Sequence, residues 1–176
     1  MKIIHLLCMV LCLECSLFLQ PCYADTPPVD EYKIKAGYLF NFTKFITWSD
    51  ENTETFNICI VGTDPFGELI DPIEQRTAFN RPIKLFRLTS INDSPHCHIA
   101  YISAGISIKS IGDNIKNILT VGEEAPFIKQ DGMIAFVKKD DKIKLQINLK
   151  RLQQSGLKIS AKLLEVSEIV VGGGND

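Results

Sequence analysis

The chain has 176 residues, of which 45% are hydrophobic, and its formal net charge is -2 with a sequence pI near 5.9. This length fits a single globular domain with its own hydrophobic core. A charge so close to neutral provides no strongly basic patch for phosphate groups, so we exclude nucleic acid as a partner.

Residues 1–24 have the features of a cleaved export signal. Lys2 supplies a positive charge, Ile3–Leu13 is an apolar run, and Cys22-Tyr23-Ala24 has the residues expected at a cleavage site before Asp25. A retained membrane anchor is the alternative, but the apolar run is interrupted by Glu14 and is shorter than the roughly 20 residues that a spanning helix needs. We therefore expect a signal peptide at 1–24 and one exported domain at 25–176.

Removal of this signal would leave only two of the six cysteines, Cys59 and Cys97. An even number of cysteines in an oxidising compartment favours a disulfide bond. The alternative is a pair of buried free thiols.

The first predicted element of the exported domain is a helix over residues 31–47, with Asp30 as its capping residue. Its apolar residues recur at steps of three and four and so form one stripe, which consists of Tyr38, Leu39, Phe42, Phe45 and Ile46. Such an aromatic stripe is typical of a helix that packs on a sheet. A partner-binding surface would need the same residues, and the sequence alone does not separate the two interpretations.

Strands and helices alternate along the rest of the chain. Strands are predicted at residues 56–62, 83–88, 96–102, 119–121 and 132–137, and helices at 65–75, 106–117, 149–154 and 161–170, with a brief helix or turn around Phe127. A charged turn at 138–142 leads into the alternating segment 143–148, which predicts a hairpin. The pattern indicates a single three-layer α/β domain with a mainly parallel sheet, helices on both faces and a hairpin at the edge. In a doubly wound sheet the strands that carry Cys59 and Cys97 are neighbours, close enough for a disulfide.

Motifs for catalysis or cofactor binding are missing. The turn Gly62-Thr63-Asp64-Pro65 is not a phosphate-binding loop, and Ser103 does not sit in a nucleophile elbow. His96 and His98 would share one face of a strand and could bind a metal, but no third ligand is evident. Arg81 precedes a strand and fits either a ligand anion or a structural ion pair. We therefore expect a protein without catalytic residues, metal or cofactor.

Six segments carry a resemblance, at residues 35–48, 58–67, 81–83, 97–103, 132–137 and 156–164. Taken in order, they resemble the YfiR family of periplasmic proteins. The resemblance implies an exported α/β domain without catalysis, often dimeric. In the system of the family's best-known member, such a domain represses an inner-membrane diguanylate cyclase by binding its periplasmic sensor region, and an outer-membrane lipoprotein relieves the repression. Cyclic-di-GMP output, and with it biofilm formation, is then controlled across the membrane.

The resemblance also bears on the cysteines. Cys59 and Cys97 fall on the positions of a family disulfide, whereas the second cysteine pair of the best-known member has no counterpart here. We therefore do not carry over any redox role of that second pair.

Three hypotheses about function follow. The first is a regulatory protein whose partner surface combines the 33–48 helix with nearby loops, through Tyr38, Asn41, Phe42, Phe45, Trp48, Asp64, Phe66 and Arg81. The second is a small-ligand-binding module at the carboxyl ends of the strands, with Arg81 and the aromatic residues as contacts. The third is an exported enzyme that acts through His98 or Ser103.

Overall fold

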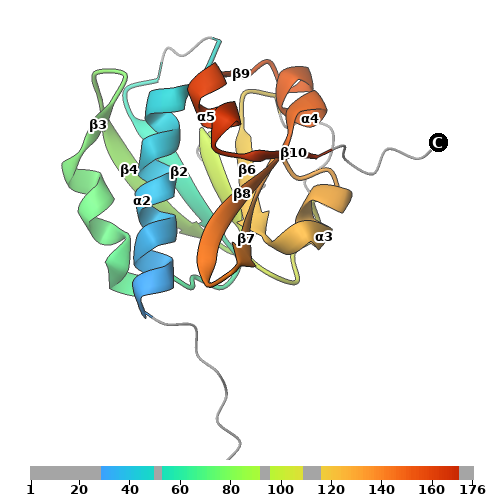
Figure 1. The fold of residues 1–176 in the computed structure, drawn as a ribbon. Coiled ribbons are helices and arrows are strands. Elements are labelled where there is room, and N and C mark those ends of the chain that lie inside the picture. The colour runs from blue at the N-terminus through green and yellow to red at the C-terminus, as the bar shows by residue number, and fades with distance from the viewer. Residues whose placement is uncertain (1–28, 50–52, 92–95, 109–115, 171–176) are drawn as a thin grey trace, which may run out of the picture.

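The computed structural model describes residues 29–49, 53–91, 96–108 and 116–170. Within these residues an eight-stranded sheet runs through the domain in the order β10-β8-β7-β6-β5-β2-β4-β3 (Figure 1). Its strands are β2 (Phe56–Val61), β3 (Thr77–Ala78), β4 (Arg81–Leu88), β5 (Ile99–Ile102), β6 (Leu119–Glu123), β7 (Ile134–Lys139), β8 (Lys142–Asn148) and β10 (Glu168–Val170). The prediction of one α/β domain is confirmed.

The helices of the described residues are short, apart from the first. They are α2 (Val29–Phe45), the 3-10 helices η2 (Gly67–Leu69) and η3 (Asp71–Gln75), α3 (Glu124–Lys129), α4 (Leu149–Gln154) and α5 (Ala161–Glu165). A separate two-stranded sheet pairs β1 (Ile46–Thr47) with β9 (Lys158–Ile159). The predicted helix at 149–154 is confirmed, and the Asn148 side chain caps it by accepting from the Arg151 amide at 3.1 Å.

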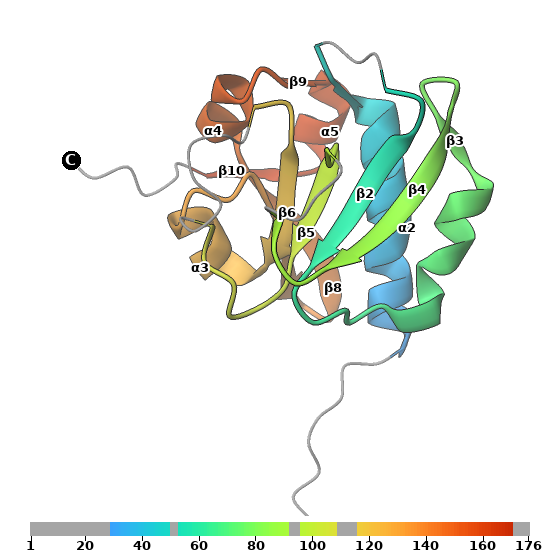
Figure 2. The ribbon, with the colours of Figure 1, turned by 180° about the vertical axis from the view of Figure 1, so that it is seen from behind.

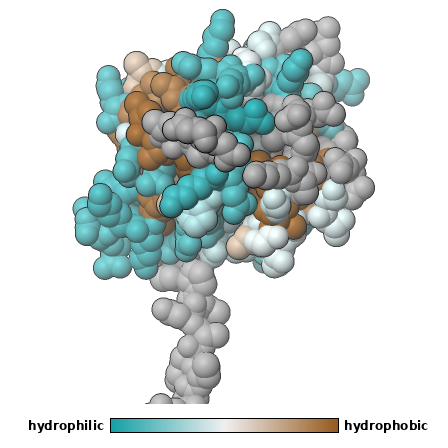
Figure 3. Space-filling view, turned by 90° about the vertical axis from the view of Figure 1, so that its right-hand side faces the viewer, coloured by the Kyte–Doolittle hydropathy of each residue, from teal (hydrophilic) through white to brown (hydrophobic). Residues whose placement is uncertain are grey.

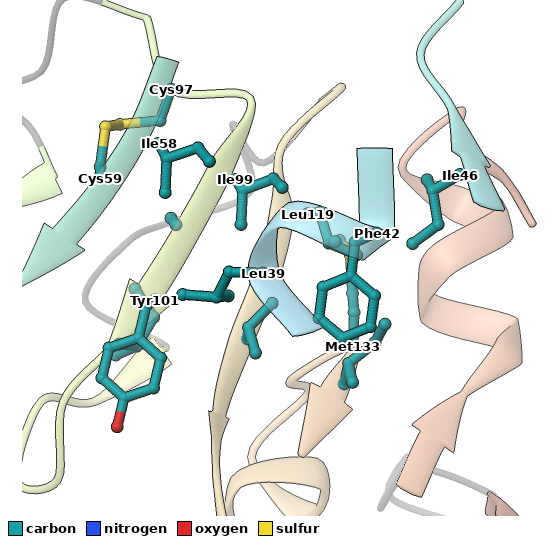
Figure 4. Packing of buried hydrophobic residues seen from close by; sticks show 14 of the residues in the cluster. Leu39, Phe42, Ile46, Ile58, Cys59, Cys97, Ile99, Tyr101, Leu119 and Met133 are labelled. Carbon is teal, nitrogen blue, oxygen red and sulfur yellow. A yellow bond between two sulfur atoms is a disulfide. The ribbon is translucent and has the colours of Figure 1, made fainter. Parts of the chain in front are cut away.

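Helix α2 covers one face of the sheet, as the front and back views show (Figures 1 and 2). Leu39 and Phe42 of this helix, and Ile46 directly after it, are at most 1% exposed, and they lie over residues of the central strands (Figure 4). The core interpretation is therefore confirmed for these three residues of the stripe, whereas Tyr38 and Phe45 are only partly buried. The helix begins at Val29, so Asp30 lies inside it and the predicted cap is wrong.

Helix α3 packs on the opposite face through Phe127. A Cβ atom added to Gly122 would lie 2.4 Å from that ring, and one added to Gly132 would lie 2.3 Å from it. Gly122 is next to Val121 in β6, and alternate residues of a strand point to opposite faces. The two glycines therefore let the ring approach the backbone, and helices flank the sheet on both sides.

The sheet is mixed, so the expected mainly parallel sheet is only partly correct. Strands β4, β2, β5, β6 and β7 pair in parallel, whereas the β7–β8 hairpin and the β3–β4 pair are antiparallel. The hairpin is not at the edge, because β10 adds to β8 in parallel. The helix predicted over 161–170 ends at Glu165, and the segment with Ile169 and Val170 forms this edge strand instead, as β-branched residues favour.

Two other elements differ from their predictions. The segment 65–75 contains two 3-10 helices in place of one α-helix, and Leu69 is 36% exposed. Pro72, which has no amide hydrogen to donate, stands at the start of the second one. Strand β5 begins at Ile99 and not at His96, whose φ of 48° is outside the range of a strand. Most of the helix predicted at 106–117 lies outside the described residues.

Replacing Phe42 by alanine should lower the free energy of unfolding by about 3 to 5 kcal/mol, because it deletes a fully buried ring. Lys44→Ala, on the exposed side of the same helix, should change it by no more than about 0.5 kcal/mol. Chemical denaturation of both variants measures the difference. Equal stability of Phe42→Ala and the wild type would contradict the core assignment.

Candidate functional site

The residues of the predicted partner surface differ in burial. Phe42, Trp48 and Phe66 are 0%, 7% and 2% exposed, so they are core residues and their assignment to a surface is wrong. Tyr38, Asn41, Phe45, Asp64 and Arg81 are partly exposed. Helical spacing puts the first three of these on one side of α2. The structure therefore leaves five of the eight residues accessible to a partner.

Trp48 is held at the end of α2 by specific contacts. Its indole Nε1 donates to the backbone oxygen of His98 at 3.1 Å. Its ring packs edge-on against Phe56 at 5.1 Å between centroids and against Phe79 at 5.8 Å. Trp48 thus ties the segment after α2 to the amino ends of the strands, and its role is structural.

Arg81 lies at the amino end of β4 and not at the carboxyl ends, where the small-ligand hypothesis needs it. Its Nη1 donates to the Thr53 hydroxyl at 2.6 Å. Its guanidinium lies 5.7 Å from the centre of the Phe56 ring and 5.9 Å from that of Phe79. Its contacts with these aromatic rings make it part of the packing at this end of the sheet.

Asp64 organises the turn that follows β2. One carboxylate oxygen accepts from the amides of Phe66 and Gly67, at 2.7 and 3.2 Å. The other accepts from Arg87 Nε at 2.6 Å, and Arg87 also reaches Asp71 at 2.7 Å. This network fixes η2 and the start of η3 against β4.

The disulfide between Cys59 and Cys97 is present, as predicted, and both residues are fully buried. It joins β2 to the segment before β5, and β2 and β5 are neighbours in the sheet (Figure 4). The bond spans a sequence separation of 38, so it closes a loop that contains η2, η3 and β4.

His98 is a buried, hydrogen-bonded core histidine. Its Nδ1 accepts from the Asn57 amide at 2.9 Å, and its ring stacks on Phe56 at 4.5 Å. Burial, with the nearby charges of Arg81 and His96, lowers its pKa to about 4. Among the described residues no three His, Cys, Asp or Glu side chains are placed to hold a metal ion.

A buried charge cluster that sequence reasoning missed joins α2 to β6. Lys35 is 2% exposed, and its Nζ lies 2.7 Å from Glu31 and 3.0 Å from Glu123. The Tyr101 hydroxyl also donates to Glu123. Burial lowers the pKa of Lys35, but the hydrogen bonds to Glu31 and Glu123 outweigh it and the pKa is raised. Burial, together with the bond to Glu123, raises the pKa of Tyr101.

This cluster is a structural tie, because the single cation of Lys35 joins a carboxylate of α2 to a carboxylate of β6. A signal for it was present in the sequence. Lys35 stands four residues before Leu39 on the buried stripe and four after Glu31, which is the spacing of a helical ion pair.

A cavity of about 290 Å³ opens at the carboxyl ends of β5 and β6. It is lined by Ser103, Gly105, Glu123, Glu124, Phe127 and Gln130 among others. Open α/β sheets bind ligands outside the carboxyl ends of their strands, where the strand order reverses. The strand order reverses between β2 and β5, so the cavity at the ends of β5 and β6 lies beside that point and not at it.

A family model described as YfiR/HmsC-like matches residues 32–168, which is most of the chain. The chain belongs to the YfiR/HmsC-like family. This family is a periplasmic and regulatory one, and membership suggests a regulator of cyclic-di-GMP signalling. Comparison with curated proteins finds no match. None of the described helices is long and apolar enough to span a membrane.

Loss of the disulfide should lower the free energy of unfolding by up to about 4 kcal/mol, since the bond restricts the unfolded chain. We expect reduced wild-type protein to have the same melting temperature as the double variant Cys59→Ala/Cys97→Ala. Reductant should not change the melting temperature of the variant. Thermal denaturation with and without reductant tests this. An equal melting temperature of the wild type with and without reductant would contradict this stabilising role of the disulfide.

The depressed pKa of His98 should make stability fall as the pH is lowered from about 6.5 to about 4. In this range the unfolded chain binds a proton that the folded chain excludes, at a cost of up to about 3 kcal/mol. Urea denaturation at several pH values measures the slope. His98→Gln, which does not titrate, should flatten it, and equal slopes for both proteins would refute the assignment.

Proposed function

We propose that this protein is an exported, non-catalytic regulator that represses an inner-membrane diguanylate cyclase by binding the periplasmic region of that enzyme. Membership in the YfiR/HmsC-like family is the observation that carries the proposal. Export depends on residues 1–24 acting as a signal peptide, and the buried disulfide supports it, because such bonds persist in oxidising compartments.

Binding would act on the cyclase through a difference in affinity. A ligand shifts a receptor between two states only as far as it binds one state more tightly than the other. The regulator would therefore bind the inactive form of the periplasmic region better. An outer-membrane lipoprotein that competes for the regulator would relieve the repression, and a homodimer would offer its surface to two receptor chains.

The accessible residues of the predicted surface are candidates for this contact. Tyr38, Asn41 and Phe45 lie on one side of α2, whereas Asp64 follows the carboxyl end of β2 and Arg81 stands at the amino end of β4. Their partial exposure supports a role in binding.

A second candidate function is a small-ligand-binding module, which the cavity at the carboxyl ends of β5 and β6 favours. Its volume is near the lower limit of typical ligand pockets. A ligand held there would raise the melting temperature of the protein in proportion to its occupancy.

Cells that lack the gene for this protein should contain more cyclic-di-GMP and attach more strongly to surfaces. Full-length protein should reverse both effects, whereas a version lacking residues 1–24, confined to the cytoplasm, should not. Binding of the purified exported protein to the periplasmic region of the cyclase tests the contact directly. Unchanged cyclic-di-GMP in the deletion strain, together with no association at micromolar concentration, would overturn the proposal.

A further inference from the structure

A groove lies between α2 and the two 3-10 helices η2 and η3. These elements are on the side of the domain away from α3 and α4 (Figure 1). It has a volume of about 150 Å³ and an apolar lining that includes Ala36, Phe40, Leu69, Ile70 and Ile73. Ile70 and Ile73 are buried and form its base, whereas Leu69 is 36% exposed at the rim. An open apolar groove of this kind is a feature of binding surfaces.

Gly37 lines the groove from the middle of α2. A glycine inside a helix costs roughly 0.5 to 1 kcal/mol relative to alanine. A Cβ atom added at Gly37 would meet no atom within 4 Å, so packing inside this chain does not require the glycine. What the missing side chain provides is room for another molecule to approach the helix backbone.

The charges around the groove have one sign. Lys33 and Arg76 line it, and Arg76 and Lys44 lie 5.8 and 4.7 Å from the centre of the Phe40 ring. None of these three cations forms an ion pair with a carboxylate in the part of the chain that the structure describes.

The acidic residues of the neighbouring 3-10 helices do not neutralise them. Asp71 is paired with Arg87, and Glu74 accepts from the Leu85 amide at 2.9 Å. Glu68 is exposed and does not line the groove. An occupant that complements this surface therefore combines an apolar side chain with carboxylates.

We propose that this groove docks an acidic amphipathic segment of a partner protein, which inserts an apolar side chain over Gly37 and Phe40 and places carboxylates beside Lys33, Lys44 and Arg76. In the cell this segment belongs to the periplasmic region of the receptor, an assignment that rests on the proposed function. The apolar contact supplies most of the affinity, because exposed ion pairs contribute little. The cations orient the segment and speed its association.

A second copy of this chain is the competing occupant. The side that carries α3 and α4 has separate apolar areas at its surface (Figure 3). Around β10, Val166 and Ile169 are 68% and 54% exposed beside the acidic residues Glu165 and Glu168. This segment has the required chemistry, so self-association must be measured together with partner binding.

The test uses the exported protein and three variants. Gly37→Leu adds a side chain at the groove, from a Cβ position that meets no atom within 4 Å, and should keep or raise the melting temperature. Arg76→Glu reverses one groove charge. Lys142→Glu makes the same change of charge at the exposed turn of the β7–β8 hairpin and serves as the control. The probes are the periplasmic region of the cyclase and a short synthetic amphipathic peptide of leucine and glutamate, with its leucine and lysine counterpart.

We expect Gly37→Leu and Arg76→Glu to weaken binding of the glutamate peptide and of the cyclase region by about tenfold or more, which corresponds to about 1.4 kcal/mol. Lys142→Glu should bind as the wild type does. Added salt should weaken the wild-type complex more than the Arg76→Glu complex.

The peptide separates failure of the groove from failure of the proposed function. Groove-dependent peptide binding without cyclase binding supports the groove and contradicts the proposed receptor. Equal binding of the cyclase region by the wild type and all variants overturns the groove proposal alone. Equal affinity for the glutamate and lysine peptides, or no binding of the glutamate peptide, overturns it as well. Wild-type dimers that Gly37→Leu converts to monomers would make a second copy the occupant and overturn the proposal.

Discussion

The docking of α2 on the sheet is the contact on which the rest of the domain depends. Leu39 and Phe42 bury one side of the helix against the central strands, and Ile46 continues this contact just after the helix, at roughly 1.5 to 3 kcal/mol for each large apolar side chain. Because a helix turns once in 3.6 residues, the buried side determines the directions in which the other residues of the helix face. The stripe of Lys33, Gly37, Phe40 and Lys44 lies on another side of the helix and is available as a surface, because Phe40 is only partly buried against the core and the other three residues are exposed.

Polar and covalent ties hold the same arrangement at both ends of the sheet. At the carboxyl ends, Lys35 bridges Glu31 of its own helix to Glu123 of β6. At the amino ends, the Trp48 indole bonds to the backbone of His98, next to the residue that carries the disulfide. A helix anchored at two points cannot rotate about its axis, so the exposed stripe keeps one orientation toward a partner.

The sequence predicts those elements whose signal is local and misses those that depend on distant contacts. The helix at 149–154 is predicted from signals close to it in the chain, such as Gly156 just after it. The aromatic side chains of Trp48 and Phe66 were assigned to a surface because an aromatic residue near a turn has the same local pattern inside and outside a core. Their burial is decided by partners far away in the chain, such as His98 for Trp48 and Tyr101 for Phe66. The edge strand β10 was likewise missed because only its pairing with β8 distinguishes it from the end of a helix.

The groove also links the candidate surface to the redox state of the protein. One wall, η2 and η3, lies inside the loop that Cys59 and Cys97 close, whereas the other wall, α2, lies outside it. In the chain-entropy model a disulfide acts on the unfolded chain, whose freedom it removes, and leaves the native contacts unchanged. The wall formed by η2 and η3 is also fixed by the hydrogen bonds of Arg87 to Asp64 and Asp71, and these do not depend on the disulfide. Reduction would therefore change how much folded regulator is present, and not the shape of the groove that a folded molecule offers.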